Sequence, residues 1–104
     1  MATVKVKPGI CGLNTTVTVT SEDMQTANVA IESDCPAVKQ MEAELQEIDS
    51  YSECFSKFLD SRVYGAAHKH CRHVACPVPS AVIKGVEVAC GLALPKDVQF
   101  SIEK

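Results

Sequence analysis

The architecture of this chain is clearest in residues 13–33, LNTTVTVTSEDMQTANVAIES. β-Branched residues alternate with a period of two over residues 13–20, and Ala27, Val29 and Ile31 repeat that period after a polar connection. A period of two with many β-branched residues is typical of strands that bury one face. We therefore expect two neighbouring strands joined by a short link.

A further strand is expected before this stretch. Residues 3–7 alternate in the same way, with Val4 and Val6 on one face, and Pro8 and Gly9 then break the strand with a turn. Three strands joined by short links indicate an antiparallel meander.

After residue 34 the period of the apolar residues changes to that of a helix. The pattern predicts four helices, the second of them over residues 50–59, with a C-terminal glycine at Gly91 after the fourth. The residues expected on their inner sides are, in chain order, Val38, Met41, Leu45 and Ile48; Tyr51, Phe55, Phe58 and Leu59; Val63, Ala66, Ala67 and His70; and Val82, Ile83, Val86 and Ala89.

Alternation returns at the end of the chain, where Val98, Phe100 and Ile102 predict a last strand. The order βββααααβ predicts an α+β fold, with a small and mostly antiparallel sheet of about four strands and helices packed on one face. A chain of 104 residues, of which 46% are hydrophobic and 22% charged, fits one domain over residues 1–104.

No apolar run reaches transmembrane length, and residues 1–7 lack the charged and apolar regions of a signal peptide. We therefore expect a cytoplasmic protein without a membrane partner. In that compartment the six cysteines are kept reduced, so a disulfide framework does not explain them.

The charge of the chain is unevenly distributed. The net charge of −3 argues against a general nucleic-acid binder. Residues 61–76, however, contain Arg62, Lys69, Arg72 and all three histidines, and no acidic residue. A basic patch of this kind can attract an anion without making the whole protein basic.

Three cysteines lie where predicted elements begin or end. Cys35 precedes Pro36, at or near the start of the first helix, and Cys76 precedes Pro77 in the loop into the fourth helix. Cys11 lies in a glycine-flanked turn. Free backbone N–H groups and the helix dipole favour the thiolate, which is the form that binds metals. If these ends meet at one edge of the sheet, the three cysteines form a thiolate site.

The fourth ligand of such a site is open: His73, three residues before Cys76, or else water or a substrate. Three thiolates and an imidazole suit structural zinc, and three thiolates with an open position equally suit an iron–sulfur cluster. Sulfurs that share one zinc ion lie within about 4 Å of one another, and those around a cluster somewhat farther apart. Because the chain has no Cys-x-x-Cys pair, the choice between zinc and an iron–sulfur cluster stays open.

The other cysteines are expected to play different parts. Cys54 and Cys90 lie on apolar helical faces and are expected to fill the core. Cys71 lies among basic neighbours that lower a thiol pKa, so a reactive thiol and an exposed bystander both stay open. The tract formed by His68, His70 and His73 is either a solvated basic face or a site for a metal or an anion.

The chain lacks the common nucleotide-binding, metalloprotease and serine-hydrolase motifs, and its length leaves little wall for a substrate pocket. We therefore expect a binding protein rather than an enzyme, although Cys-His catalysis stays open. The alternatives are a thiol redox or carrier protein without a metal, and a plain interaction domain whose patch over residues 62–73 holds an anionic partner. A homodimer is compatible with the sequence, which identifies neither partner nor pathway.

The chain resembles a family of uncharacterised small prokaryotic proteins, a domain of unknown function. The resemblance rests on four segments: Gly9-Ile10-Cys11-Gly12, Glu32-Ser33-Asp34-Cys35, the block from His73 through Cys76-Pro77-Val78-Pro79 to Lys84, and Gly91 to Val98. It covers nearly the whole chain and brings no established activity. It implies only that Cys11, Cys35 and Cys76 belong together as a set.

Overall fold

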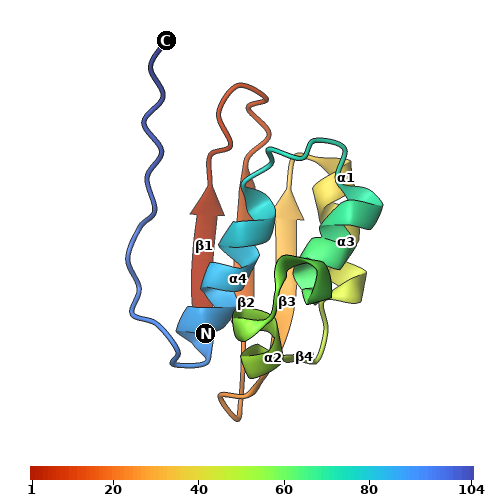
Figure 1. The fold of residues 1–104 in the computed structure, drawn as a ribbon, viewed down its shortest axis with the longest axis vertical. Helices are drawn as coiled ribbons and strands as arrows, with labels where there is room; N and C mark the ends of the chain where they lie inside the picture. Colours follow the sequence, from red (N-terminus) through yellow and green to blue (C-terminus); the bar gives the residue numbers. More distant parts are fainter.

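The computed structural model describes residues 1–104, which form one antiparallel four-stranded sheet with helices against it (Figure 1). The order of the strands in the sheet is β1-β2-β3-β4. Their bounds are β1 (Ala2–Val6), β2 (Thr15–Thr20), β3 (Thr26–Ser33) and the two-residue β4 (Ile48–Asp49). The α+β prediction and the antiparallel meander are confirmed.

The register of the meander explains which face of the sheet is buried. Val17 of β2 lies opposite Val4 of β1 on one side and Ile31 of β3 on the other. Val17 and Ile31 have no exposed surface, whereas the intervening Thr16 and Thr18 face away from the core and keep part of theirs. The period of two therefore puts the Val and Ile side chains under the helices and a threonine-rich surface on the other side.

The helical elements follow β3 in the chain. Their bounds are α1 (Pro36–Lys39), the 3-10 helix η1 (Gln40–Glu44), α2 (Ser50–Phe55), the 3-10 helix η2 (Phe58–Asp60), α3 (Arg62–His70) and α4 (Val78–Ala89). In Figure 1, α4 lies on one face of the sheet, over β1 and β2, and α3 lies beside β3, packed against α1, η1 and α4. No helix is long and apolar enough to cross a membrane.

α4 packs closely on the sheet because of one glycine. A Cβ atom at Gly85 would lie 2.9 Å from Cγ2 of Val19 and 3.3 Å from Cγ2 of Val4, so only glycine allows this approach. Val82 and Val86 are fully buried beside it. As the sequence predicts, the helix ends before Gly91, whose φ of +72° suits the residue after a helix.

The prediction of the first helix is wrong beyond its first turn, which is α1. The residues expected on its inner side are buried, but the chain tightens into η1 and then forms β4. The edge of β3 causes this change: the Glu42 carboxylate accepts the Ile31 N–H at 2.7 Å, and the Leu45 carbonyl accepts the Val29 N–H at 3.1 Å. Pairing with an open strand edge replaces the hydrogen bonds that further helical turns would have made.

The second predicted helix is also shorter than expected, and its aromatic face points outward. Tyr51, Phe55, Phe58 and Leu59 are between 54% and 99% exposed. The buried positions of α2 are Ser50 and Glu53 instead. Glu53 faces inward because its carboxylate accepts hydrogen bonds from the Arg62 and Val63 N–H groups at 2.9 and 3.2 Å, which caps the start of α3.

The predicted last strand does not form in the isolated chain. Residues 98–102 are extended but pair with no other strand, and the side chains of Val98, Phe100 and Ile102 are 61%, 74% and 90% exposed. The fourth strand of the sheet is β4 instead.

Candidate functional site

Four of the six cysteines line one cavity at the end of the sheet where β1 and β3 finish. The cavity has a volume of about 760 Å³. Its walls come from three segments, which are the β1–β2 loop, the start of α1 with the beginning of η1, and the connection from the end of α3 to the start of α4. The cysteines among its lining residues are Cys11, Cys35, Cys71 and Cys76.

The β1–β2 loop and the end of β3 are tied together, which brings Cys11 to the same end as Cys35. The Asp34 N–H donates to the Asn14 carbonyl at 3.0 Å, and the Asn14 N–H donates to Oδ2 of Asp34 at 3.2 Å. Beyond this connection, a turn closed by a 3.0 Å hydrogen bond from the Gly12 N–H to the Gly9 carbonyl carries the exposed Cys11.

Cys35 occupies the position at the start of α1 that its proline neighbour predicts. It is the N-cap residue of α1, with extended backbone, and its N–H donates to Oγ of Ser33 at 3.0 Å. Its side chain is partly buried and packs against the hydrophobic core.

Cys71 and Cys76 close the opposite side of the cavity. Cys71 ends α3, where its N–H donates to the Ala67 carbonyl at 2.8 Å. The chain then turns, with the Cys76 N–H donating to the His73 carbonyl at 3.2 Å, and Cys76 directly precedes the N-cap of α4. Both thiols are partly buried and pack against the core.

The environment of Cys71 corrects the expectation of a basic, thiolate-favouring site. Burial, together with smaller contributions from the charges of the neighbouring Cys76 and Cys35, raises the pKa of the Cys71 thiol to about 11. Its Sγ also donates to Sδ of the buried Met41 at 3.4 Å. The thiol therefore lies inward among sulfur atoms, while the basic Arg72 and His73 are exposed.

The histidines of the tract divide between the cavity and solvent. His70 and His73 line the cavity, whereas His68 does not. The imidazole of His70 bonds to the carboxylate of Glu44, an interaction that also holds the Glu44 pKa below its usual range. His73 is exposed at the rim.

All four residues predicted as ligands, Cys11, Cys35, Cys76 and His73, thus line the same cavity. No three His, Cys, Asp or Glu side chains, however, lie close enough together in this arrangement to hold one metal ion. The separation of about 4 Å expected for shared zinc is therefore not met. The sequence pattern does not place Cys71 among the predicted ligands. The signal that could have included it is its closeness to Cys76, from which only four residues separate it.

The remaining cysteines lie elsewhere, as expected for packed residues. Cys90 is 4% exposed at the end of α4, and Cys54 packs against the core from α2. Burial raises the pKa of the Cys54 thiol to about 11, with further contributions from the charges of Glu87, Glu53 and Cys90.

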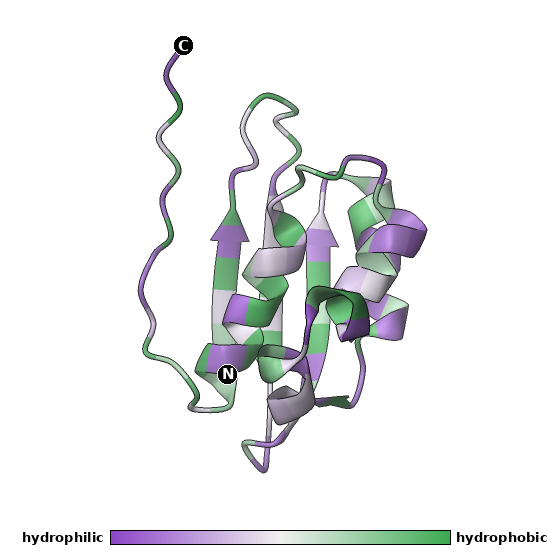
Figure 2. Cartoon of the chain, in the orientation of Figure 1, coloured by the Kyte–Doolittle hydropathy of each residue, from purple (hydrophilic) through white to green (hydrophobic).

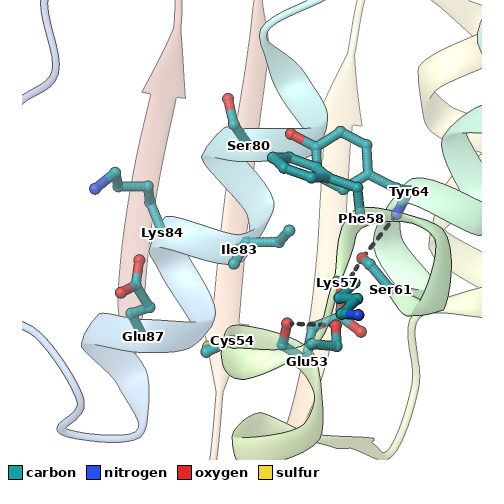
Figure 3. A pocket seen from close by; sticks show the side chains of 11 residues that line it. Glu53, Cys54, Lys57, Phe58, Ser61, Tyr64, Ser80, Ile83, Lys84 and Glu87 are labelled. Atoms are coloured by element: carbon teal, nitrogen blue, oxygen red, sulfur yellow. Dashed lines mark hydrogen bonds between the residues drawn. The ribbon is translucent and has the colours of Figure 1, made fainter.

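Cys54 also lines a second, smaller pocket of about 250 Å³ between α2 and α4 (Figure 3). Figure 3 shows Lys84 and Glu87 on α4 and Glu53 on α2 around it. The carboxylate of Glu53 is already engaged by Ser61 and the first N–H groups of α3. We assign this pocket a structural role.

Comparisons with known proteins identify the family of the chain but no activity. No curated protein and no solved structure matches it. A family model described as a family of unknown function, DUF6951, matches residues 2–102, which is nearly the whole chain. The cysteine-lined cavity lies within the matched residues. The chain belongs to the DUF6951 family.

Proposed function

We propose that this protein binds an iron–sulfur cluster through the thiolates of Cys11, Cys35, Cys71 and Cys76. The observation that carries the proposal is that these four cysteines, from three segments of the chain, line one cavity. Iron–sulfur clusters are held by four cysteine thiolates, so the donor set has the right chemistry and number. Cys71 replaces His73 as the fourth ligand of the site inferred from the sequence.

The size of the cavity favours a cluster over a single zinc ion. A single zinc ion needs its sulfur ligands about 2.3 Å away, and no three candidate side chains are that close together. The thiolates around a cluster lie farther apart, because irons and sulfides fill the space between them. A cavity of about 760 Å³ suits a group larger than one ion.

The charge around the cavity also supports an anionic cofactor. A cluster held by four thiolates carries negative charge, and His70, Arg72 and His73 line the same cavity. Lys69 lies outside the cavity, and both Lys69 and His70 pair with the Glu44 carboxylate, which offsets part of this charge.

The proposal includes a cytoplasmic location, because thiols remain free for metal binding in a reducing compartment. It gives the protein a binding role and assigns it no reaction. In the absence of a cation the Cys71 thiol stays protonated, as its raised pKa indicates, and a coordinated metal would deprotonate it.

The test measures iron, acid-labile sulfide, zinc and the visible spectrum of protein purified without oxygen. We expect iron and sulfide with broad thiolate-to-iron absorption in the wild type, and their loss in Cys35→Ser and Cys76→Ser. Cys54→Ser is the matched control, since Cys54 lies outside the cavity, and it keeps the wild-type iron content. Equal metal content in all three variants overturns the assignment, and stoichiometric zinc without iron overturns the choice of cluster.

The fourth ligand is tested by two further variants. Cys71→Ser is expected to lower the iron content and change the visible spectrum, whereas His73→Ala leaves both unchanged. The reverse result restores His73 as the ligand.

A second candidate function is thiol–disulfide exchange, favoured by the proximity of the Cys71 and Cys76 thiols in the cavity. These two thiols would pass two electrons and two protons to a low-molecular-weight disulfide and become one disulfide themselves. Thiol titration separates the two functions. Metal-bound cysteines stay protected until a chelator is added, whereas a redox pair reacts with oxidised glutathione at once and yields a disulfide between residues 71 and 76.

A further inference from the structure

The C-terminal tail, residues 94–104, is an extended segment without a partner. It forms no backbone hydrogen bond with the rest of the chain. In Figure 2 it alternates between hydrophobic and hydrophilic residues along its length. Val98, Phe100 and Ile102 project from one face and are 61–90% exposed. A segment with the pattern of a half-buried strand therefore has nothing to bury that face against.

The sheet has one free edge that matches this segment. The outer edge of β3 is covered by β4 and by the residues from Glu42 to Gln46, whereas β1 pairs only with β2. An open strand edge presents unpaired N–H and C=O groups that can pair with another strand. In Figure 1 the tail passes along the β1 side of the molecule without joining the sheet.

The two faces of the tail correspond to the two faces of β1. Val4 of β1 faces the core and is only partly buried, and Ala81 and Val88 of α4 are likewise half-buried. Ile83, on a different side of the helix, lines the pocket shared with α2. A strand beside β1 with its apolar side chains on the helix side would cover Val4, Ala81 and Val88 together.

The polar faces match by charge. Lys5 projects from the face of β1 that no helix covers. Lys7 follows two residues later, just beyond the end of β1, and is also exposed. On the tail, Asp97 and Glu103 are an odd number of residues from Phe100. In an extended strand they therefore lie on the face opposite to Phe100, which is the face that no helix would cover. Opposite charges on neighbouring strands stabilise the pair.

The end of α4 directs the tail away from its own sheet. Gly91 has a positive φ, and the N–H groups of Leu92 and Ala93 both donate to the Glu87 carbonyl, at 2.8 and 3.3 Å. This cap fixes the direction in which the chain leaves the helix. The tail then stands clear of its own β1, with its apolar residues exposed.

We propose that the tail of one copy of this chain adds as an edge strand to β1 of a second copy, and that the exchange is reciprocal. The result is a twofold-symmetric dimer in which each tail covers the free edge of its partner. Residues 98–102 are then a strand, as their sequence pattern predicts, but in the sheet of the neighbouring chain.

Sedimentation of the full-length chain across a dilution series tests the proposal. We expect the mass of two chains for the wild type. Phe100→Asp is expected to weaken the dimer by about tenfold or more, because it puts a charge at the centre of the buried face. Gln99→Asp is the matched control: it adds the same charge one residue away on the uncovered face and leaves the dimer in place. A wild type that remains a single chain overturns the proposal, and so does a dimer that Phe100→Asp leaves intact.

Hydrogen exchange separates a second copy from folding of the tail onto its own edge. Protection of the amides of residues 98–102 is expected to disappear on dilution together with the dimer mass. Protection that is independent of concentration, in a chain of single mass, overturns the exchange. Iron content is measured on the same samples, and Phe100→Asp keeps it, so this outcome is independent of the cluster proposal.

Discussion

Cys71 and Cys54 have thiols with the same pKa but belong to two different regions of the molecule. Burial is the largest cause in both cases, and it raises each pKa to about 11. The remaining causes differ: Cys71 is surrounded by Cys76 and Cys35, whereas Cys54 lies near two glutamates and Cys90. A raised pKa alone therefore does not distinguish a candidate site from a packed cysteine. The identity of the neighbours does, since sulfur neighbours supply further ligands and carboxylates at a packing contact do not.

The largest expected difference between the two regions is in metal content. Cys76→Ser removes a cavity thiol and is expected to lower the iron content roughly tenfold or more. Cys90→Ser puts a hydroxyl at a buried position, 4% exposed, at the end of α4. It is expected to lower the unfolding free energy by about 1–3 kcal/mol without loss of iron. Metal analysis and urea denaturation of both variants check this. Iron loss from both variants to the same extent would remove the distinction.

The next effect concerns Glu53, whose carboxylate makes the α2–α3 region a structural unit. Glu53→Ala leaves the Arg62 and Val63 N–H groups and the Ser61 hydroxyl without their acceptor, and we expect a loss of about 3 kcal/mol in unfolding free energy. Urea denaturation measures it, with the exposed Glu22→Ala as a control that changes stability by less than about 0.5 kcal/mol. An equally small effect of both substitutions would show that Glu53 does not hold α3.

The smallest effect is the response of the metal-free protein to alkaline pH. Because the pKa values of Cys54 and Cys71 are raised from 9.0 to about 11, the folded chain binds protons more tightly than the unfolded chain. The stability that these protonated thiols contribute is complete below pH 9 and is lost as the pH rises toward 11. Thermal unfolding of the metal-free protein across this range measures the decline. The double variant Cys54→Ala, Cys71→Ala is expected to flatten it, and an unchanged decline in that variant would contradict the assignment.

The elements that the sequence predicted well are those with purely local causes. The meander follows from β-branched residues with a period of two, and α3 and α4 follow from apolar residues at helical spacing. The helix expected after Pro36 stops early because Glu42 and Leu45 bond to the edge of β3. No local pattern contains that contact, because the partners are distant in the sequence.

The two other differences in the fold also have non-local causes. Hydrophobicity places Phe55 and Phe58 on the inner face of a predicted helix over residues 50–59, but the capping of α3 by Glu53 leaves both side chains exposed. Residues 98–102 have the pattern of a strand, and the isolated chain offers them no bonded neighbour. A period reveals that a face is apolar without revealing what covers it.

The candidate site was predictable in part for a similar reason. Cys11, Cys35 and Cys76 were recognisable because each lies at the end of an element. Cys71 has basic sequence neighbours, but Arg72 and His73 are exposed while the Cys71 thiol lies against Met41. The turn of the chain after α3 directs the Cys71 thiol inward, and the types of its sequence neighbours do not reveal that direction.

The cavity walls come from segments spread between residues 8 and 78, and this has a consequence for the biogenesis of the protein. The β1–β2 hairpin leaves the ribosome long before α3 and α4 are complete, so a nascent chain offers an incoming group only one or two thiols at a time. The cavity is complete only after the last helix has packed on the sheet. Under the proposed function, loading therefore follows folding, and detachment of any one wall opens the site.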